Sequence, residues 1–130
     1  MKILCLCEQG INRSVTLASM LKHSHETLSA GILTNSQETL NQLILWADKV
    51  ILTDTVQVSL TAGWIPPEKI ELFNVGPDKY PRPYNNHLRK LFIKHIERNK
   101  DWLMKNDCTK CKTGIIVNGQ CNNPDCPSNT

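Results

Sequence analysis

The chain has 130 residues, of which 40% are hydrophobic and 21% are charged, and its formal net charge is +3. This length supports one core of ordinary size and little more, so we expect one domain with an appendage. No apolar run approaches the ~18 residues of a membrane span, which excludes an integral membrane protein. The small net charge does not by itself indicate a nucleic-acid-binding protein.

The six cysteines form two groups, a front pair at 5 and 7 and a rear quartet at 108, 111, 121 and 126. The apolar run at the N-terminus, residues 3–7, is too short for a signal peptide, and no small-residue cleavage site follows it. We therefore expect a cytoplasmic protein with reduced thiols. In a reducing compartment such cysteines are more often catalytic or metal-bound than paired in disulfides.

The first half of the chain alternates strand and helix patterns. Residues 2–6 predict a buried strand, and apolar residues at helical spacing predict a helix from Ser14 to about His23. A short second strand is expected over 27–30. Ser36 is typical of a helix N-cap, and the helix that follows has an apolar face of Leu40, Leu43, Ile44 and Ala47.

The second half continues the alternation. We expect a buried strand over 49–53, one or two helical turns over 56–61, a fourth strand over 70–75, and a long helix over about 85–105. The inner stripe of that helix is predicted to be Leu88, Leu91, Phe92, His95, Ile96, Trp102 and Leu103. The alternation predicts an α/β fold, a three-layer open parallel four-stranded sheet. We place this domain at residues 1–105 and an extension at 106–130.

The stretch CEQGINRS, residues 7–14, lies between the first strand and the first helix. Ligands bind open parallel sheets at this kind of edge, and a helix N-terminus there offers free N–H groups and partial positive charge to a phosphoryl group. The same environment favours the reactive thiolate form of Cys7. Arg13 can bind two phosphate oxygens at once, and Gly10 permits the positive φ of a tight loop that wraps an anion.

This Cys-x5-Arg-Ser pattern resembles the phosphate-binding loop of the low-molecular-weight protein tyrosine phosphatases. That family carries the loop after its first strand and its general acid on a late Asp-x-Tyr loop before the last helix. Here the late loop is GPDKYPRPY, with Asp78 and Tyr80. LSAG at 28–31, LWADKVILTD at 45–54 and GPDKY at 76–80 also look like a small bacterial branch of predicted tyrosine phosphatases.

The resemblance implies a cysteine-dependent phosphatase that acts on phosphotyrosine or a related phosphomonoester and needs no catalytic cofactor. Cys7 is the expected nucleophile, Arg13 the transition-state stabiliser and Asp78 the general acid and base. Ser14 is expected to donate its hydroxyl to the sulfur. The backbone N–H groups of the loop are expected to bind phosphate; its residues are Glu8, Gln9, Gly10, Ile11, Asn12 and Arg13.

Several positions depart from the family pattern. Gly10 replaces the usual Asn, Val15 the usual Pro, and Asn12 the second loop cysteine that many members use for redox protection. Lys79 stands where a proline is common, and beside the pocket mouth it either selects a more anionic substrate or faces solvent. Cys5 is too poorly placed on the same strand for a disulfide to Cys7, and we expect a buried structural thiol.

Alternative interpretations remain open for the general acid and for Cys7. The sequence Gly-Pro-Asp is common in turns, so Asp78 can be a plain turn residue. Asp54, which follows the third strand, is a competing acid at the same sheet edge, although a helix N-cap is the favoured role. An inert buried Cys7 is the remaining alternative, but it leaves Arg13 and Asp78 without a reason for their positions.

The rear quartet, Cys108, Cys111, Cys121 and Cys126, has the spacing C-x2-C and C-x4-C around a segment that predicts a hairpin with an Asn118-Gly119 turn. Four thiolates satisfy a tetrahedral zinc ion and leave no open position, so we expect a structural zinc ribbon. Two disulfides or free thiols are the alternatives. The ribbon can cap the last helix, mediate dimerisation or recognise a partner, including nucleic acid, and the sequence does not decide between these roles.

Two further functions and one partner remain open. Arsenate reduction on the same fold normally recruits more redox cysteines, and none lies between residues 8 and 107. A binding module for phosphoryl ligands or nucleic acid would keep the fold without turnover. The segment 82–105 carries seven Lys or Arg against Glu97 and Asp101, which indicates a solvated helix face or a docking surface for an acidic partner.

Overall fold

The structure is a computed structural model that describes residues 1–103, 116–117 and 120–121. The chain divides into two compact units, Met1–His95 and Ile96–Thr130. The α/β fold and the candidate catalytic residues belong to the first unit. The predicted domain boundary between 105 and 106 stays a prediction.

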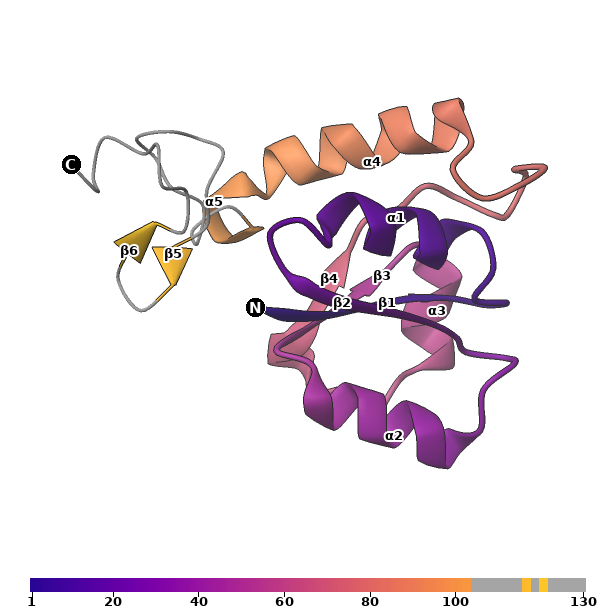
Figure 1. Cartoon of the computed structure of the whole chain (residues 1–130). Coiled ribbons are helices and arrows are strands. Elements are labelled where there is room, and N and C mark those ends of the chain that lie inside the picture. Colours follow the sequence, from indigo (N-terminus) through magenta and orange to yellow (C-terminus); the bar gives the residue numbers. More distant parts are fainter. Residues whose placement is uncertain (104–115, 118–119, 122–130) are drawn as a thin grey trace. The chain divides into compact units, whose positions relative to one another are not determined.

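A four-stranded parallel sheet forms the centre of the first unit (Figure 1). Its strands are β1 (Lys2–Cys7), β2 (Glu26–Gly31), β3 (Lys49–Leu52) and β4 (Ile70–Leu72). They are arranged in the order β2-β1-β3-β4. The first strand is therefore central, and the register pairs Cys7 with Gly31 on one side and Leu6 with Leu52 on the other.

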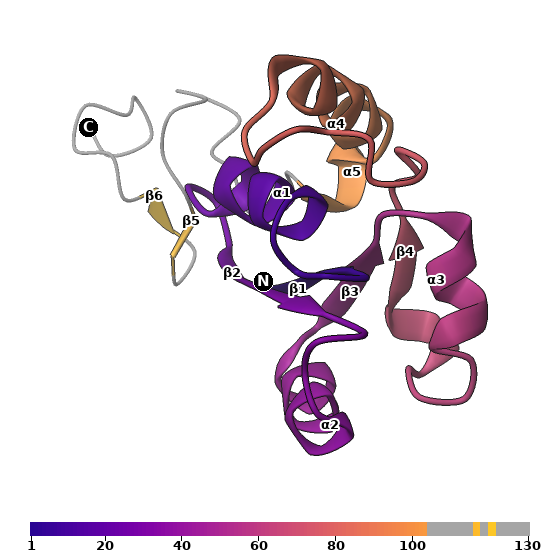
Figure 2. The ribbon, with the colours of Figure 1, turned by 90° about the vertical axis from the view of Figure 1, so that its right-hand side faces the viewer.

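Helices connect the strands of the first unit and lie on both faces of its sheet. They are α1 (Arg13–Leu21), α2 (Gln37–Trp46), α3 (Thr55–Leu60) and a 3₁₀ turn η1 (Pro67–Lys69). Two more helices follow the last strand in sequence: α4 (Asn86–Arg98), which crosses the boundary between the units, and α5 (Lys100–Leu103), which belongs to the second unit. Helices α1 and α2 lie on opposite faces of the sheet (Figures 1 and 2). This arrangement confirms the predicted open α/β sheet.

The central strand is buried on both faces because it lies between two other strands and beneath helices on either side. Successive side chains of a strand point to opposite faces. Leu4 and Leu6 join the apolar cluster beneath α2, which also contains Leu40, Ile44, Val50 and Leu52. Ile3, Cys5 and Cys7 alternate with them and are also fully buried. Cys7 is therefore the buried last residue of a strand that is packed on both faces.

Two predicted helix starts are confirmed by their caps. The Ser36 hydroxyl accepts a hydrogen bond from the Thr39 backbone N–H at 3.1 Å. The Asp54 carboxylate accepts one from Val56 N–H at 3.4 Å, so Asp54 has the N-cap role that we favoured. Each side chain satisfies a donor that the first helical turn leaves free.

Two predicted elements differ in extent. The strand expected over 70–75 ends at Leu72, although Phe73 N–H and Val75 N–H still donate to carbonyls of the β3 segment at 2.8 and 2.9 Å. The long helix expected over 85–105 is interrupted at Asn99. At the interruption the backbone tightens, because Asn99 N–H donates to Ile96 O at 3.1 Å and Trp102 N–H donates to Asn99 O at 3.2 Å, each three residues back.

The strand pairing of the predicted hairpin is present in the second unit, while its Asn118-Gly119 turn lies outside the described residues. Strands β5 (Ile116–Val117) and β6 (Gln120–Cys121) pair antiparallel. The zinc prediction falls on Cys108, Cys111, Cys126 and the side chain of Cys121, which lie outside the described part of the chain. None of the helices among the described residues has the length and apolar character needed to cross a bilayer.

Candidate active site

The candidate loop follows the carboxyl end of β1, where the strand order of the sheet reverses. The chain passes from β1 to β2 on one side, and β3 pairs with β1 on the other side. Open α/β sheets bind ligands at such a switch point. Cys7 ends β1 at this point, and Arg13 and Ser14 begin α1.

The loop between them is packed directly onto the end of β2. Gly10 has φ +75°, as its sequence position predicted, and a Cβ atom on it would lie 2.6 Å from the Gly31 backbone nitrogen. Three hydrogen bonds fix the loop's carbonyls: Ile32 N–H to Cys7 O at 2.8 Å, Leu33 N–H to Glu8 O at 2.9 Å, and the Thr34 hydroxyl to Gln9 O at 3.0 Å. The loop is therefore bonded to the residues that directly follow β2.

The Cys7 sulfur has two hydrogen-bond contacts, one with Gly10 and one with Ser14. Gly10 N–H donates to Cys7 Sγ at 3.0 Å, and Ser14 Oγ lies 3.2 Å from the same sulfur, where its hydroxyl can donate to a thiolate. Cys7 is only 1% exposed. The Ser14 placement agrees with the sequence expectation. Both contacts stabilise a sulfur that carries negative charge.

Cys5 lies two residues earlier on the same strand and is fully buried. Its burial raises the pKa of the Cys5 thiol strongly, and the nearby Cys7 adds to that effect. Cys5 therefore stays a neutral thiol at physiological pH, in agreement with the structural role expected for it.

Arg13 is 1% exposed and its guanidinium contacts three acceptors. Nη1 donates to Gly76 O at 2.8 Å and lies 3.5 Å from the Asp54 carboxylate, while Nη2 pairs with the Glu8 carboxylate. The remaining donor, Nε–H, is buried and has no hydrogen-bond partner among the residues that the structure describes. A buried donor without an acceptor is costly, so this position suits an anionic oxygen.

The two carboxylates around Arg13 were not assigned to it from the sequence. Asp54 was considered as a competing acid or an N-cap, and it serves as the N-cap of α3 while its other oxygen faces Arg13. The contact between Asp54 and Arg13 could have been predicted from the pairing of β1 with β3, because the carboxyl ends of these strands lie at the same edge of the sheet. The pairing of Glu8 with Arg13 depends on side-chain conformation, which the sequence pattern does not specify.

The late loop brings Asp78 next to the loop that joins Cys7 to Arg13. Asn12 Nδ2 donates to Asp78 Oδ1 at 3.2 Å, to Asp78 Oδ2 at 3.1 Å and to Tyr80 O at 3.1 Å. Asp78 itself is exposed, and Tyr80 N–H donates to its Oδ1 at 3.3 Å. The carboxylate is thus joined to the loop through Asn12, a contact that sequence analysis missed.

Tyr80 supports the base of this late loop. Its hydroxyl donates to Val75 O at 2.8 Å. Burial raises the pKa of Tyr80, the Asp78 charge raises it further, and the Arg13 charge acts in the opposite direction. The phenol therefore remains protonated at neutral pH and keeps its hydrogen bond.

The other predicted loop residues are more open. Gln9 and Ile11 are exposed, with Ile11 at 60%. Lys79, beside Asp78, is also exposed. Among the residues described, no group of three or more His, Cys, Asp or Glu side chains is arranged to hold a metal ion.

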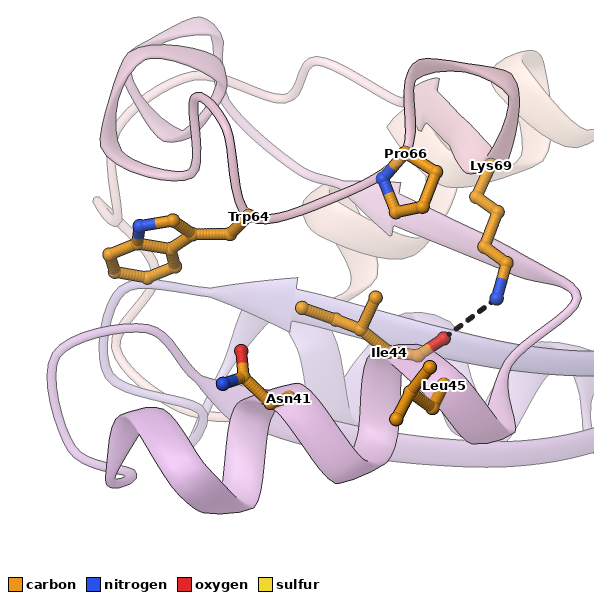
Figure 3. Close-up of a pocket in the computed structure, with 6 residues that line it drawn as sticks. All are labelled: Asn41, Ile44, Leu45, Trp64, Pro66 and Lys69. Atoms are coloured by element: carbon orange, nitrogen blue, oxygen red, sulfur yellow. Dashed lines mark hydrogen bonds between the residues drawn. The ribbon is translucent and has the colours of Figure 1, made fainter.

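A separate pocket of about 320 Å³ lies between α2 and the segment before β4 (Figure 3). Its lining is mostly apolar, and Lys69 Nζ crosses one end to donate to Ile44 O at 3.0 Å. The lining residues are Asn41, Ile44, Leu45, Trp64, Pro66 and Lys69. None of them belongs to the Cys7 loop or the Asp78 loop, so this pocket is distinct from the candidate active site.

Three solved structures share the fold of this chain. The YwlE arginine phosphatase from Geobacillus stearothermophilus has a TM-score of 0.57 at 15% identity, over 82% of this chain and 97% of its own. A low-molecular-weight phosphotyrosine phosphatase from Vibrio cholerae O395 has a TM-score of 0.57 at 15% identity, over 78% and 96%. Vibrio vulnificus Wzb in complex with benzylphosphonate has a TM-score of 0.53 at 19% identity, over 80% and 97%.

No family model matches the sequence, and no curated protein matches it. At identities of 15–19%, the likeness to the solved structures establishes a shared fold. That fold is the one the sequence resemblance implied, and the chain spans nearly the whole length of each of these proteins.

Proposed function

We propose that this protein is a cysteine-dependent phosphatase that hydrolyses phosphotyrosine or a related phosphomonoester. The arrangement of Cys7 and Arg13 supports this most strongly. A sulfur that accepts a hydrogen bond from Gly10 N–H and contacts the Ser14 hydroxyl lies at one end of a short loop, and a buried guanidinium whose Nε has no partner among the described residues lies at the other. The fold shared with two phosphatases adds support.

In the proposed first step, the Cys7 thiolate attacks phosphorus and the bond to the leaving oxygen breaks. Asp78 gives its proton to that oxygen, so that the phenol or alcohol leaves neutral. In the second step, the Asp78 carboxylate takes a proton from water, which attacks the cysteinyl-phosphate and releases inorganic phosphate. The Ser14 hydroxyl stabilises the departing thiolate.

Arg13 and the loop N–H groups bind the equatorial oxygens as charge spreads over them. In this structure, the Glu8 carboxylate pairs with one guanidinium nitrogen. We propose that the phosphoryl group takes the place of the Glu8 carboxylate at Nη2 and accepts a bond from Nε. The Asp54 and Gly76 contacts would then hold Nη1 in place during turnover.

Hydrolysis of p-nitrophenyl phosphate by the purified protein tests the proposal. We expect turnover in the unmodified protein, loss in Cys7→Ser, and retained binding of vanadate by that variant. Binding of vanadate by the unmodified protein without turnover would favour a phosphoryl-ligand binding module. Efficient reduction of arsenate would favour the arsenate reductase instead.

The acid role of Asp78 is tested separately. Asp78→Asn is expected to lower kcat/KM about 10²-fold or more for substrates with poor leaving groups and far less for substrates with good ones. Equal slowing of both would reject the role. Asp54→Asn is the matched comparison, because Asp54 caps α3 and contacts Arg13 and should not change leaving-group dependence.

We also propose that the rear cysteines bind one structural zinc ion. The spacing of Cys108, Cys111, Cys121 and Cys126 supports this, since two cysteine pairs flanking a hairpin are typical of a zinc ribbon. The substrate is proposed to be a phosphorylated protein or a small phosphomonoester in the cytoplasm. Exposed basic residues on α4, among them Arg89, Lys90 and Lys94, are consistent with an acidic partner.

A further inference from the structure

One side chain of the phosphate-binding loop connects it to the loop that carries Asp78. Asn12 Nδ2 lies within 3.2 Å of both Asp78 carboxylate oxygens and of Tyr80 O. The two loops are 66 residues apart in sequence. A single carboxamide therefore joins the segment that would bind the phosphoryl group to the segment that would deliver the proton.

Asn12 makes these contacts instead of capping its own helix. It occupies the N-cap position of α1, yet its side chain forms no capping hydrogen bond. Asparagine is among the best N-cap residues, and a cap stabilises a helix by about 1 kcal/mol. The side chain that is well suited to the helix is thus directed to the Asp78 loop.

Two further contacts hold the late loop against the start of α1. Arg13 Nη1 donates to Gly76 O at 2.8 Å. Tyr84 N–H donates to Thr16 Oγ1 at 2.9 Å, and that hydroxyl donates to Asn12 O at 2.7 Å. Tyr84 has φ +63°, a conformation that a bulky side chain adopts only when its surroundings hold it. The late loop is therefore anchored at its beginning, middle and end.

We infer that Asn12 is the positioning residue for the general acid, holding the Asp78 carboxylate over the phosphate-binding loop. The inference rests on the proposed phosphatase function. The amide lies at nearly equal distances from the two carboxylate oxygens, so one oxygen can carry the proton while the other keeps the hydrogen bond. Because Asn12 precedes Arg13 directly, the acid moves with the phosphate-binding residues and not independently of them.

The test compares two substrates in matched variants. Phenyl phosphate has a poor leaving group and needs the acid, whereas 2,4-dinitrophenyl phosphate has a good one and does not. Asn12→Ser keeps a residue that favours the N-cap but is too short to reach Asp78. Asn12→Ala is a second variant in case serine finds another partner. Asn86→Ala, at the exposed start of α4, is the control.

We expect Asn12→Ser to lower kcat/KM for phenyl phosphate about 10- to 100-fold, a part of what a general acid contributes. Because kcat/KM covers only the steps up to release of the leaving group, kcat/KM for 2,4-dinitrophenyl phosphate and inhibition by vanadate should stay near those of the unmodified protein. In the Asp78→Asn background, Asn12→Ser should cost little more, since the two side chains act as one unit. Asn86→Ala should match the unmodified protein throughout.

Equal slowing of both substrates by Asn12→Ser, or multiplication of the Asn12 and Asp78 effects in the double variant, would overturn the inference. Weaker vanadate inhibition would also overturn it, because Asn12 would then serve phosphate binding. Failure of the proposed function looks different. The unmodified protein would hydrolyse neither substrate, whatever residue stands at position 12.

Discussion

The close contact between the loop that joins Cys7 to Arg13 and strand β2 predicts a large effect of Gly10→Ala on stability. Gly10 has φ +75°, where an L-residue with a Cβ costs about 1–2 kcal/mol. The new Cβ would also lie 2.6 Å from Gly31 N and 2.9 Å from Ala30 C. Both are backbone atoms of β2, which cannot move away without disturbing its pairing with β1.

Gly63→Ala is the matched control because Gly63 has φ +81° but nothing within 4 Å of its Cβ position. It should cost only the backbone strain. Overpacking adds about 1–3 kcal/mol, so Gly10→Ala should destabilise the protein by that much more than Gly63→Ala. The smaller entropy of an unfolded chain that contains alanine affects both variants alike and cancels in the comparison.

Urea denaturation of the two variants measures this difference in the free energy of unfolding. Vanadate inhibition and p-nitrophenyl phosphate turnover measure the consequence for the site, because a displaced Gly10 N–H no longer supports the Cys7 sulfur. We expect Gly63→Ala to retain both. Equal destabilisation by Gly10→Ala and Gly63→Ala would show that the loop does not pack against β2 as described.

Three further outcomes are expected. Glu8→Gln should tighten vanadate inhibition by about three- to tenfold, since it removes a negative charge that competes for Arg13; weaker inhibition would show that Glu8 instead holds the arginine in place. Ser14→Ala should let the phosphorylated protein accumulate and lower kcat even for good leaving groups, and quench-flow measurement with no accumulation would reject the hydroxyl's role at Cys7. Metal analysis should find one zinc per chain, lost in Cys108→Ser, whereas a metal-free protein with disulfides would refute the ribbon.

The sequence predicted the parts of the site that are local along the chain. Cys7, Gly10, Arg13 and Ser14 lie within eight residues at a strand-to-helix junction, where the spacing limits the possible geometry. The sequence pattern and the family resemblance together predicted the placement of these residues, the positive φ of Gly10 and the parallel sheet. The catalytic roles given to these residues remain proposals.

Contacts between distant segments were not accessible in the same way. From the sequence, Asn12 was interpreted only as a loop residue in place of the usual second cysteine. Its bond to Asp78 joins residues 66 positions apart, and only the tertiary fold brings them together. Glu8 contributed only its backbone to the prediction, since side-chain conformation decides whether it meets Arg13. The interruption of the last helix at Asn99 was missed because a hydrophobic stripe predicts the buried face of a helix but not the place where its backbone tightens to bonds three residues apart.

The most direct test of the whole account is to trap the covalent intermediate. Protein mixed with a fast aryl phosphate and quenched in acid within milliseconds would be digested and analysed by mass spectrometry. The account predicts a phosphoryl group on the Cys7 sulfur, present during turnover and absent from Cys7→Ser. Turnover with the phosphoryl group on another residue, or undiminished hydrolysis by Cys7→Ser, would contradict it.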